Sequence, residues 1–89
     1  MLQIKYKNTF EKDVKLAKKR GKDLEKIKEV IHCLANEQSL PLNYRDHALI
    51  GNYVGHRECH IEPNWLLIYK KDSETLILER TGTHSDLFK

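Results

Sequence analysis

The sequence predicts an α+β domain: an N-terminal strand, two antiparallel helices, and a three-stranded antiparallel meander, with the helices packed on an antiparallel sheet. Three observations lead to this fold class. Residues 2–6 alternate between apolar and polar side chains, which is typical of a strand. Two amphipathic stretches with helical spacing follow, separated by a glycine. Three short apolar runs with turn residues between them then occupy residues 56–80.

The first helix is expected to begin directly after the strand. Asn8 and, three residues later, Glu11 form a capping-box pattern with Asn in place of the usual Ser or Thr. The apolar residues at helical spacing are Phe10, Val14 and Ala17 in the first helix, and Leu24, Ile27, Ile31 and Leu34 in the second. Gly21 is expected to end the first helix and Asp23 to cap the second, so a short turn leaves the two helices antiparallel.

The second half of the chain is expected to contain the meander. Residues 38–45 include a proline and are predicted to form a loop. The three strands are expected at residues 56–61, 65–69 and 75–80. Pro63 and Asn64 supply the first turn, and residues 71–73 supply the second. Gly82 is expected to end the last strand, before a polar tail.

Length and composition limit the class of protein. With 89 residues, of which 39% are hydrophobic, the chain has room for a single domain, residues 1–89, around one modest core. No stretch approaches the roughly 20 apolar residues that cross a bilayer. The first residues alternate without a charged and apolar leader, so we expect a soluble, cytoplasmic protein with no membrane contact.

The two cysteines and their histidine neighbours do not predict a cofactor. Cys33 falls in a helical pattern and Cys59 in a strand pattern, and both are expected to be reduced, partly buried thiols. His56, Cys59 and His60 suggest zinc, but a structural site usually needs two ligand pairs, and neighbours in a strand face opposite ways. The same geometry disfavours a Cys–His nucleophile. We therefore expect no metal and no other cofactor.

Positive charge is concentrated in the first helix, although the net charge is only +3. Residues 14–22 carry no acidic side chain. Their basic residues are Lys15, Lys18, Lys19, Arg20 and Lys22. A solvated helix face and a stripe that faces phosphates explain this pattern equally well.

Three histidines lie where the chain changes its secondary structure: His47, His60 and His84. Imidazole has an unperturbed pKa close to neutral pH, so it can accept and return a proton within one catalytic cycle. Taken singly, each is best explained as a surface or capping residue. Together, on a small basic scaffold, they suggest acid-base chemistry on RNA, an anionic polymer that carries its own nucleophile.

Two aromatic and two arginine residues have both a structural and a functional interpretation. Trp65 and Phe88 could belong to the core, or could form a surface on which a base stacks. Arg57 and Arg80 could be ordinary charges on the sheet, or could hold a phosphate through forked hydrogen bonds.

Motifs along nearly the whole chain carry a resemblance to a known family. They lie in residues 13–17, 46–51, 57–60, 62–69 and 79–88, and the most specific is Glu79-Arg80-Thr81-Gly82-Thr83-His84, with Leu87-Phe88 after it. With these motifs the chain resembles the RelE/ParE superfamily of bacterial toxins, and most closely its YafQ-like branch of ribosome-dependent mRNA interferases.

The resemblance implies a function and a set of partners. Members of this branch cut mRNA in the ribosomal A site with the ribose 2′-hydroxyl as nucleophile, and a cognate antitoxin silences them. Contact with operator DNA is expected only through the antitoxin complex. His47, His60 and His84 fall on catalytic positions of the family, and Trp65 and Phe88 on active-site aromatic positions.

We assign roles on this basis. His84 is expected to be the acid or base closest to the scissile bond and His60 its complement, while His47 stabilises the phosphate together with Arg57 and Arg80. Asn64, Trp65 and Phe88 are expected to contact substrate. The ribosome is expected to bind the basic face formed by Lys15, Lys18, Lys19 and Lys22.

One position departs from the family pattern, because Asn64 stands where YafQ-like toxins carry an aspartate. An amide cannot accept a proton at neutral pH, although it can form hydrogen bonds. If the aspartate is a base or orients a histidine, this chain should be a slower enzyme. The alternative hypothesis is an inactive toxin that serves as an antitoxin-binding and operator-binding module.

Overall fold

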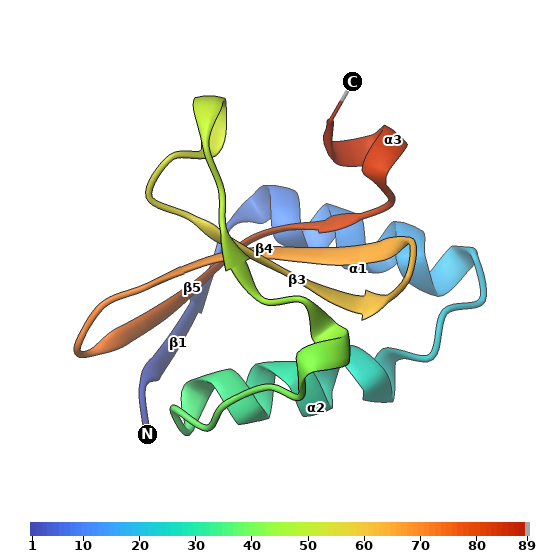
Figure 1. The fold of residues 1–89 in the computed structure, drawn as a ribbon. Coiled ribbons are helices and arrows are strands. Elements are labelled where there is room, and N and C mark those ends of the chain that lie inside the picture. Colours follow the sequence, from blue (N-terminus) through green and yellow to red (C-terminus); the bar gives the residue numbers. More distant parts are fainter. Residues whose placement is uncertain (89) are drawn as a thin grey trace.

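The computed structural model describes residues 1–88 and is built on a five-stranded sheet with the strand order β1-β5-β4-β3-β2 (Figure 1). The strands are β1 (Gln3–Tyr6), β2 (His47–Ala48), β3 (Arg57–Glu62), β4 (Trp65–Lys71) and β5 (Thr75–Gly82). The helices are α1 (Asn8–Lys19), α2 (Leu24–Ala35) and α3 (His84–Leu87), with 3-10 turns η1 (Leu42–Tyr44) and η2 (Gly51–Tyr53). The predicted α+β class is confirmed.

The sheet is mixed, whereas the sequence predicted an antiparallel one. Strands β3, β4 and β5 form the predicted antiparallel meander. β1, however, pairs in parallel with β5, from Gln3 opposite Thr75 to Tyr6 opposite Leu78. Alternation in residues 2–6 indicates a strand but carries no information about its partner. The chain passes through α1 and α2 to β2 at the opposite edge of the sheet, and the meander then returns and places β5 beside β1.

Of the three signals predicted for the ends of the two long helices, the structure confirms two. Asp23 caps α2, where its side chain accepts a hydrogen bond from the backbone N–H of Glu25. Gly21 follows the end of α1 with φ +79°, a conformation that favours glycine. The capping box at Asn8 is wrong, because Asn8 is already the first helical residue and no side chain caps α1. No helix within residues 1–88 is long and apolar enough to cross a membrane.

The two faces of the sheet bury different side chains. On the face covered by α1 and α2, the main core includes Phe10, Ile27, Val30, Leu34, Trp65, Leu67 and Tyr69. On the other face, a smaller cluster consists of Leu66, Ile68 and Leu87, with Leu49 and Tyr53 packed against it. This second face is only partly covered, by α3 and by the segment that contains Leu49 and η2, and it carries the candidate site.

The tail predicted to be polar contains helix α3. Thr83 and Asp86 form a capping box: the Thr83 hydroxyl accepts a hydrogen bond from the Asp86 N–H, and the Asp86 carboxylate accepts one from the Thr83 N–H. Arg20 of α1 donates to the same carboxylate over 2.6 Å. This charged hydrogen bond from Arg20, together with the one from Thr83, lowers the pKa of Asp86. α3 is therefore fixed to α1 by an ion pair that the local sequence does not reveal.

Candidate active site

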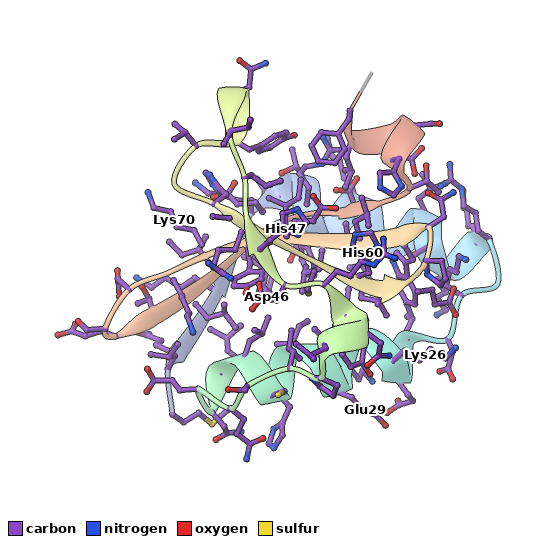
Figure 2. The ribbon with its side chains drawn as sticks, viewed as in Figure 1. Lys26, Glu29, Asp46, His47, His60 and Lys70 are labelled. Atoms are coloured by element: carbon purple, nitrogen blue, oxygen red, sulfur yellow. The ribbon has the colours of Figure 1, made fainter. Side chains whose placement is uncertain are left out.

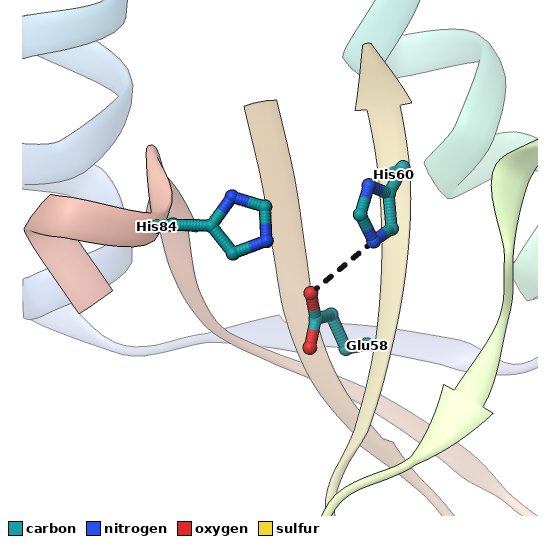
Figure 3. A group of neighbouring side chains, drawn as sticks. All are labelled: Glu58, His60 and His84. Atoms are coloured by element: carbon teal, nitrogen blue, oxygen red, sulfur yellow. Dashed lines mark ion pairs between the residues drawn. The ribbon is translucent and has the colours of Figure 1, made fainter. Parts of the chain in front are cut away.

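The structure brings His47, His60 and His84 together around a buried carboxylate, that of Glu58. His47 lies directly opposite Glu58 in the pairing of β2 with β3, and its Nε2 atom is 3.5 Å from the carboxylate. His60 is two residues further along β3 on the same face, and its Nε2 atom is also 3.5 Å away (Figure 3). His84, the first residue of α3, faces the pair, with its ring centre 5.7 Å from that of His60.

All three imidazole rings are held through Nδ1 by an oxygen. Nδ1 of His47 is 2.6 Å from the Arg45 carbonyl, and Nδ1 of His60 is 3.3 Å from the Pro63 carbonyl. Each carbonyl oxygen accepts a hydrogen bond from the nearby ring nitrogen, which therefore carries the proton. The Nε2 atoms of His47 and His60 consequently point to Glu58, and Figure 2 shows both histidines on the face away from α2.

Asn64 fixes the ring of His84 in the same way. Its Oδ1 atom accepts a hydrogen bond from the backbone N–H of His84 over 3.1 Å and lies 2.9 Å from Nδ1 of the same residue. Because this oxygen can only accept, the Nδ1 atom of His84 must carry the proton. Nε2 of His84 is left available for a substrate, so Asn64 orients the histidine from behind the ring.

Glu58 was not among the residues proposed from the sequence. Only 5% of its surface is exposed, and it lies between the rings of two histidines. Its spacing of two residues from His60 was the available signal, because such residues share one face of a strand. The pairing of β2 with β3, which places His47 over Glu58, required the fold.

Phe88 contributes an aromatic surface beside the histidines. Its side chain is 41% exposed and its ring centre is 6.4 Å from that of His84. Tyr53 of η2 meets the Phe88 ring edge-on at 5.7 Å. A base could stack on this exposed ring, and Tyr53, which the sequence analysis did not select, supports it.

Trp65 lies in the core and offers no ring to a substrate, so its predicted stacking role is wrong. Its surface is 1% exposed, and it packs in the core under α1 and α2. A bulge after His60 pairs Trp65 with Glu62 and turns the indole toward the helices, where Lys22 lies over its ring. The neighbouring Leu66, opposite His60, faces the site instead.

Arg57 lies on the face of the sheet opposite the histidines, contrary to its predicted role. It pairs in register with Tyr69 of the main core, and its Nε atom donates to Asp46 over 3.1 Å. The Tyr69 hydroxyl donates to the same carboxylate oxygen over 2.6 Å. A separation of three residues places Arg57 and His60 on opposite faces of β3, a rule that the sequence analysis did not apply.

Arg80 lies on the correct face but already binds a carboxylate. Its Nε and Nη2 atoms donate to the two oxygens of Asp13 over 2.6 and 3.2 Å. These hydrogen bonds raise the pKa of Arg80. The forked donor predicted to hold a phosphate therefore joins α1 to β5.

The basic face of α1 is partly neutralised. Lys15, Lys18 and Lys19 are exposed. Lys22 instead forms an ion pair with Glu62, with 3.0 Å between Nζ and the carboxylate. Three lysines thus remain available to a polyanion on this face.

A metal ion could occupy part of the same cluster. One donor atom each from Glu58, His60 and His84 lies within 4.8 Å of the others. Ligation would require both imidazole nitrogens to be unprotonated, so a bound ion would exclude proton transfer by these groups. The absence of a metal requirement stays a prediction.

The fold and this cluster of three histidines define a class of protein, the toxins of bacterial type II toxin-antitoxin systems. The model of one toxin family of this class, YafQ, matches residues 2–89, and the chain belongs to that family. The family resemblance inferred from the sequence is thereby confirmed.

Relatives agree over almost the full length. The chain is 49% identical over 86 residues to the mRNA interferase toxin YafQ of Escherichia coli K12, which covers 96% of this chain and 94% of the relative. A structure of the E. coli DinJ-YafQ toxin-antitoxin complex matches with a TM-score of 0.92 and 47% identity over 99% of this chain and 98% of the other. A metal-bound toxin from Helicobacter pylori matches with a TM-score of 0.92 and 46% identity over 99% and 100%.

Proposed function

We propose that this chain is an mRNA interferase, an endoribonuclease that cuts mRNA in the ribosomal A site. The observation that carries the proposal is the convergence of three imidazoles, each held at Nδ1, around the buried carboxylate of Glu58. Its relative of 49% identity is named an mRNA interferase toxin. Family membership further supports a cognate antitoxin as partner, with operator DNA bound only through the antitoxin complex.

Cleavage through the ribose 2′-hydroxyl needs one group that removes a proton and one that supplies a proton to the 5′-oxygen. His84 supplies the proton to the 5′-oxygen, because Asn64 holds Nδ1 and leaves Nε2 facing the cluster. His60 and Glu58 form the complementary pair that takes the proton from the 2′-hydroxyl. His47 stabilises the phosphate from the other side of Glu58. No step requires a metal, because the nucleophile belongs to the substrate.

A second function is an inactive toxin that acts only as an antitoxin-binding and operator-binding module. Asn64 favours it, because an amide at this position cannot carry the negative charge of the aspartate found in similar toxins. The arrangement of the three histidines and the exposed ring of Phe88 favour the enzyme.

Mapping mRNA 5′ ends after a short induction pulse distinguishes the enzyme from the inactive binding module. The chain and Glu58→Gln, His84→Ala and His32→Ala variants would be compared for growth arrest and for new 5′ ends inside coding regions. His32 lies on α2, far from the cluster, and serves as the matched control. We expect the unchanged chain and His32→Ala to produce new 5′ ends inside coding regions. Glu58→Gln and His84→Ala should lower the number of these ends by at least 10²-fold. Growth arrest without new ends would overturn the enzyme.

A further inference from the structure

The four arginines of this chain differ in whether a carboxylate binds them. Three are paired: Arg20 with Asp86, Arg57 with Asp46, and Arg80 with Asp13. Arg45 has no such partner within residues 1–88. A free guanidinium offers a planar fork of donors that matches a phosphate group.

The backbone of Arg45 is already part of the site. Its carbonyl oxygen lies 2.6 Å from Nδ1 of His47 and holds that ring toward Glu58. Arg45 follows η1 in a left-handed conformation, with φ +49° and ψ +45°. The backbone at this position thus positions His47, and Arg45 also lines a neighbouring hollow.

This hollow lies between η1 and the turn that joins β3 to β4. It has a volume of about 280 Å³, and its walls are formed by Asn43, Arg45, His60, Ile61, Glu62 and Pro63. His60 belongs both to this wall and to the cluster around Glu58. A ligand there would be small, since this volume is near the lower end of the roughly 300–1,000 Å³ of ligand pockets.

The charge of the pocket favours an anion. Glu62 contributes a carboxylate, but Lys26 and Lys22 bind its two oxygens over 2.8 and 3.0 Å. Hydrogen bonds from these lysines, Lys26 first, lower the pKa of Glu62. Because the two lysines neutralise Glu62, the guanidinium of Arg45 leaves the pocket with an excess of positive charge.

We propose that this pocket is a subsite for the mRNA nucleotide next to the scissile phosphate. Arg45 binds the phosphate of that nucleotide, and the side-chain amide of the exposed Asn43 forms hydrogen bonds with the base edge. The inference rests on the proposed function and extends it, because it locates a determinant of the cleavage sequence. It also assigns to Arg45 the phosphate contact that the sequence suggested for Arg57 and Arg80.

Steady-state cleavage of mRNA on programmed ribosomes tests the subsite. Arg45→Asn removes the guanidinium and keeps the left-handed turn, which Asn tolerates. We expect KM to rise about tenfold or more with kcat within a few-fold, and Arg45→Lys to restore part of the loss. Asn43→Ala should redistribute cleavage among codons in a randomised mRNA.

Matched controls lie away from the pocket. Lys70→Gln removes one positive charge at the other end of the sheet (Figure 2), and Asn8→Ala removes an exposed amide. Both should cleave as the unchanged chain does. If Arg45→Asn behaves as Lys70→Gln does, and Asn43→Ala leaves the cleavage pattern unchanged, the subsite is disproved.

A binding measurement separates this inference from the proposed function. A 2′-O-methyl trinucleotide, which cannot be cut, would be titrated into the chain and into Arg45→Asn by NMR. Backbone shifts at residues 43–45 that Arg45→Asn weakens about tenfold support the subsite even if no mRNA is cleaved. Cleavage of mRNA by the chain, with no shift at these residues, overturns the subsite and leaves the enzyme intact.

Discussion

Asn64 shows how one atom can orient a side chain that is proposed to be catalytic. Its Oδ1 atom binds both the backbone N–H and Nδ1 of His84, behind the ring and away from its free nitrogen. This geometry is that of an orienting residue and differs from that of a base, which must reach the substrate. The amide of Asn64 thus supplies the hydrogen bonds that hold the histidine and adds no charge beside it.

Replacing Asn64 by Asp should make the chain a faster enzyme. A carboxylate 2.9 Å from Nδ1 favours the imidazolium form of His84, which then supplies its proton over a wider pH range. We expect a single-turnover rate about tenfold higher at pH 8 and an unchanged fold. The fall in rate on the alkaline side of the pH–rate profile should begin at a higher pH. Asn8→Asp, which adds the same charge at a remote site, is the control. An increase of 10²-fold or more at all pH values would instead identify a base.

At the scale of elements, the short helix α3 depends on long-range contacts for its position. Four residues cannot form a stable helix alone. Its place is fixed by the buried Leu87 and by Asp86, which binds both Arg20 and the N–H of Thr83. Because α3 carries His84, contacts between residues far apart in the sequence decide where the imidazole proposed to supply the proton lies.

Asp86→Asn should loosen α3 in a manner that depends on pH. The pKa of Asp86 is lowered in the folded protein, so its contribution to stability is complete above the unfolded value of about 3.9 and is lost as pH falls through the folded value. We expect the variant to melt a few degrees lower at pH 7, and this difference to shrink in strong acid. Thermal unfolding at both pH values measures it, and a difference that is constant with pH would contradict the ion pair's role.

The exposed lysines of α1 should serve binding to the ribosome. Lys15, Lys18 and Lys19 share one side of the helix, and Lys22 is excluded because it binds Glu62. The triple Gln variant should bind ribosomes more weakly. The slope of the logarithm of the binding constant against the logarithm of the salt concentration should become shallower by about 0.7–0.9 per lost phosphate contact. A triple Gln variant at the exposed Lys5, Lys7 and Lys71, which lie outside α1, matches the charge change. Equal binding of the two variants at moderate salt would show that this face is only solvated.

Local sequence patterns determine the main helices and strands of this molecule, but only part of the candidate site. Periodicity and turn residues located both long helices and the meander, since these depend on neighbours in the chain. The sequence left a core position and a stacking surface equally open for Trp65, and the bulge in β3 that turns it toward the helices decides for the core. Glu58 became recognisable only when β2 placed His47 over it. The face of Arg57, by contrast, followed from its three-residue spacing to His60.

At the scale of the whole molecule, one face of the sheet carries the main hydrophobic core and the other carries the candidate site. α1 and α2 cover one face and bury most of the large apolar side chains, including Cys59, whose pKa burial raises to about 12 (Figure 1). This thiol is therefore no nucleophile at neutral pH. The other face leaves His47 half-exposed beside the buried Glu58, so a polymer that crosses this face can reach the histidine cluster.

An enzyme built in this way should follow a two-group proton profile and require no metal ion. Because one imidazole must be protonated and its partner unprotonated, single-turnover rates should rise and fall around neutral pH. The products should carry a 2′,3′-cyclic phosphate and a 5′-hydroxyl. EDTA should leave the rate unchanged where ribosomes remain intact. Added Cu²⁺ should inhibit by ligating Glu58, His60 and His84, whereas a rate that falls with EDTA and recovers with a divalent ion would contradict metal-free catalysis.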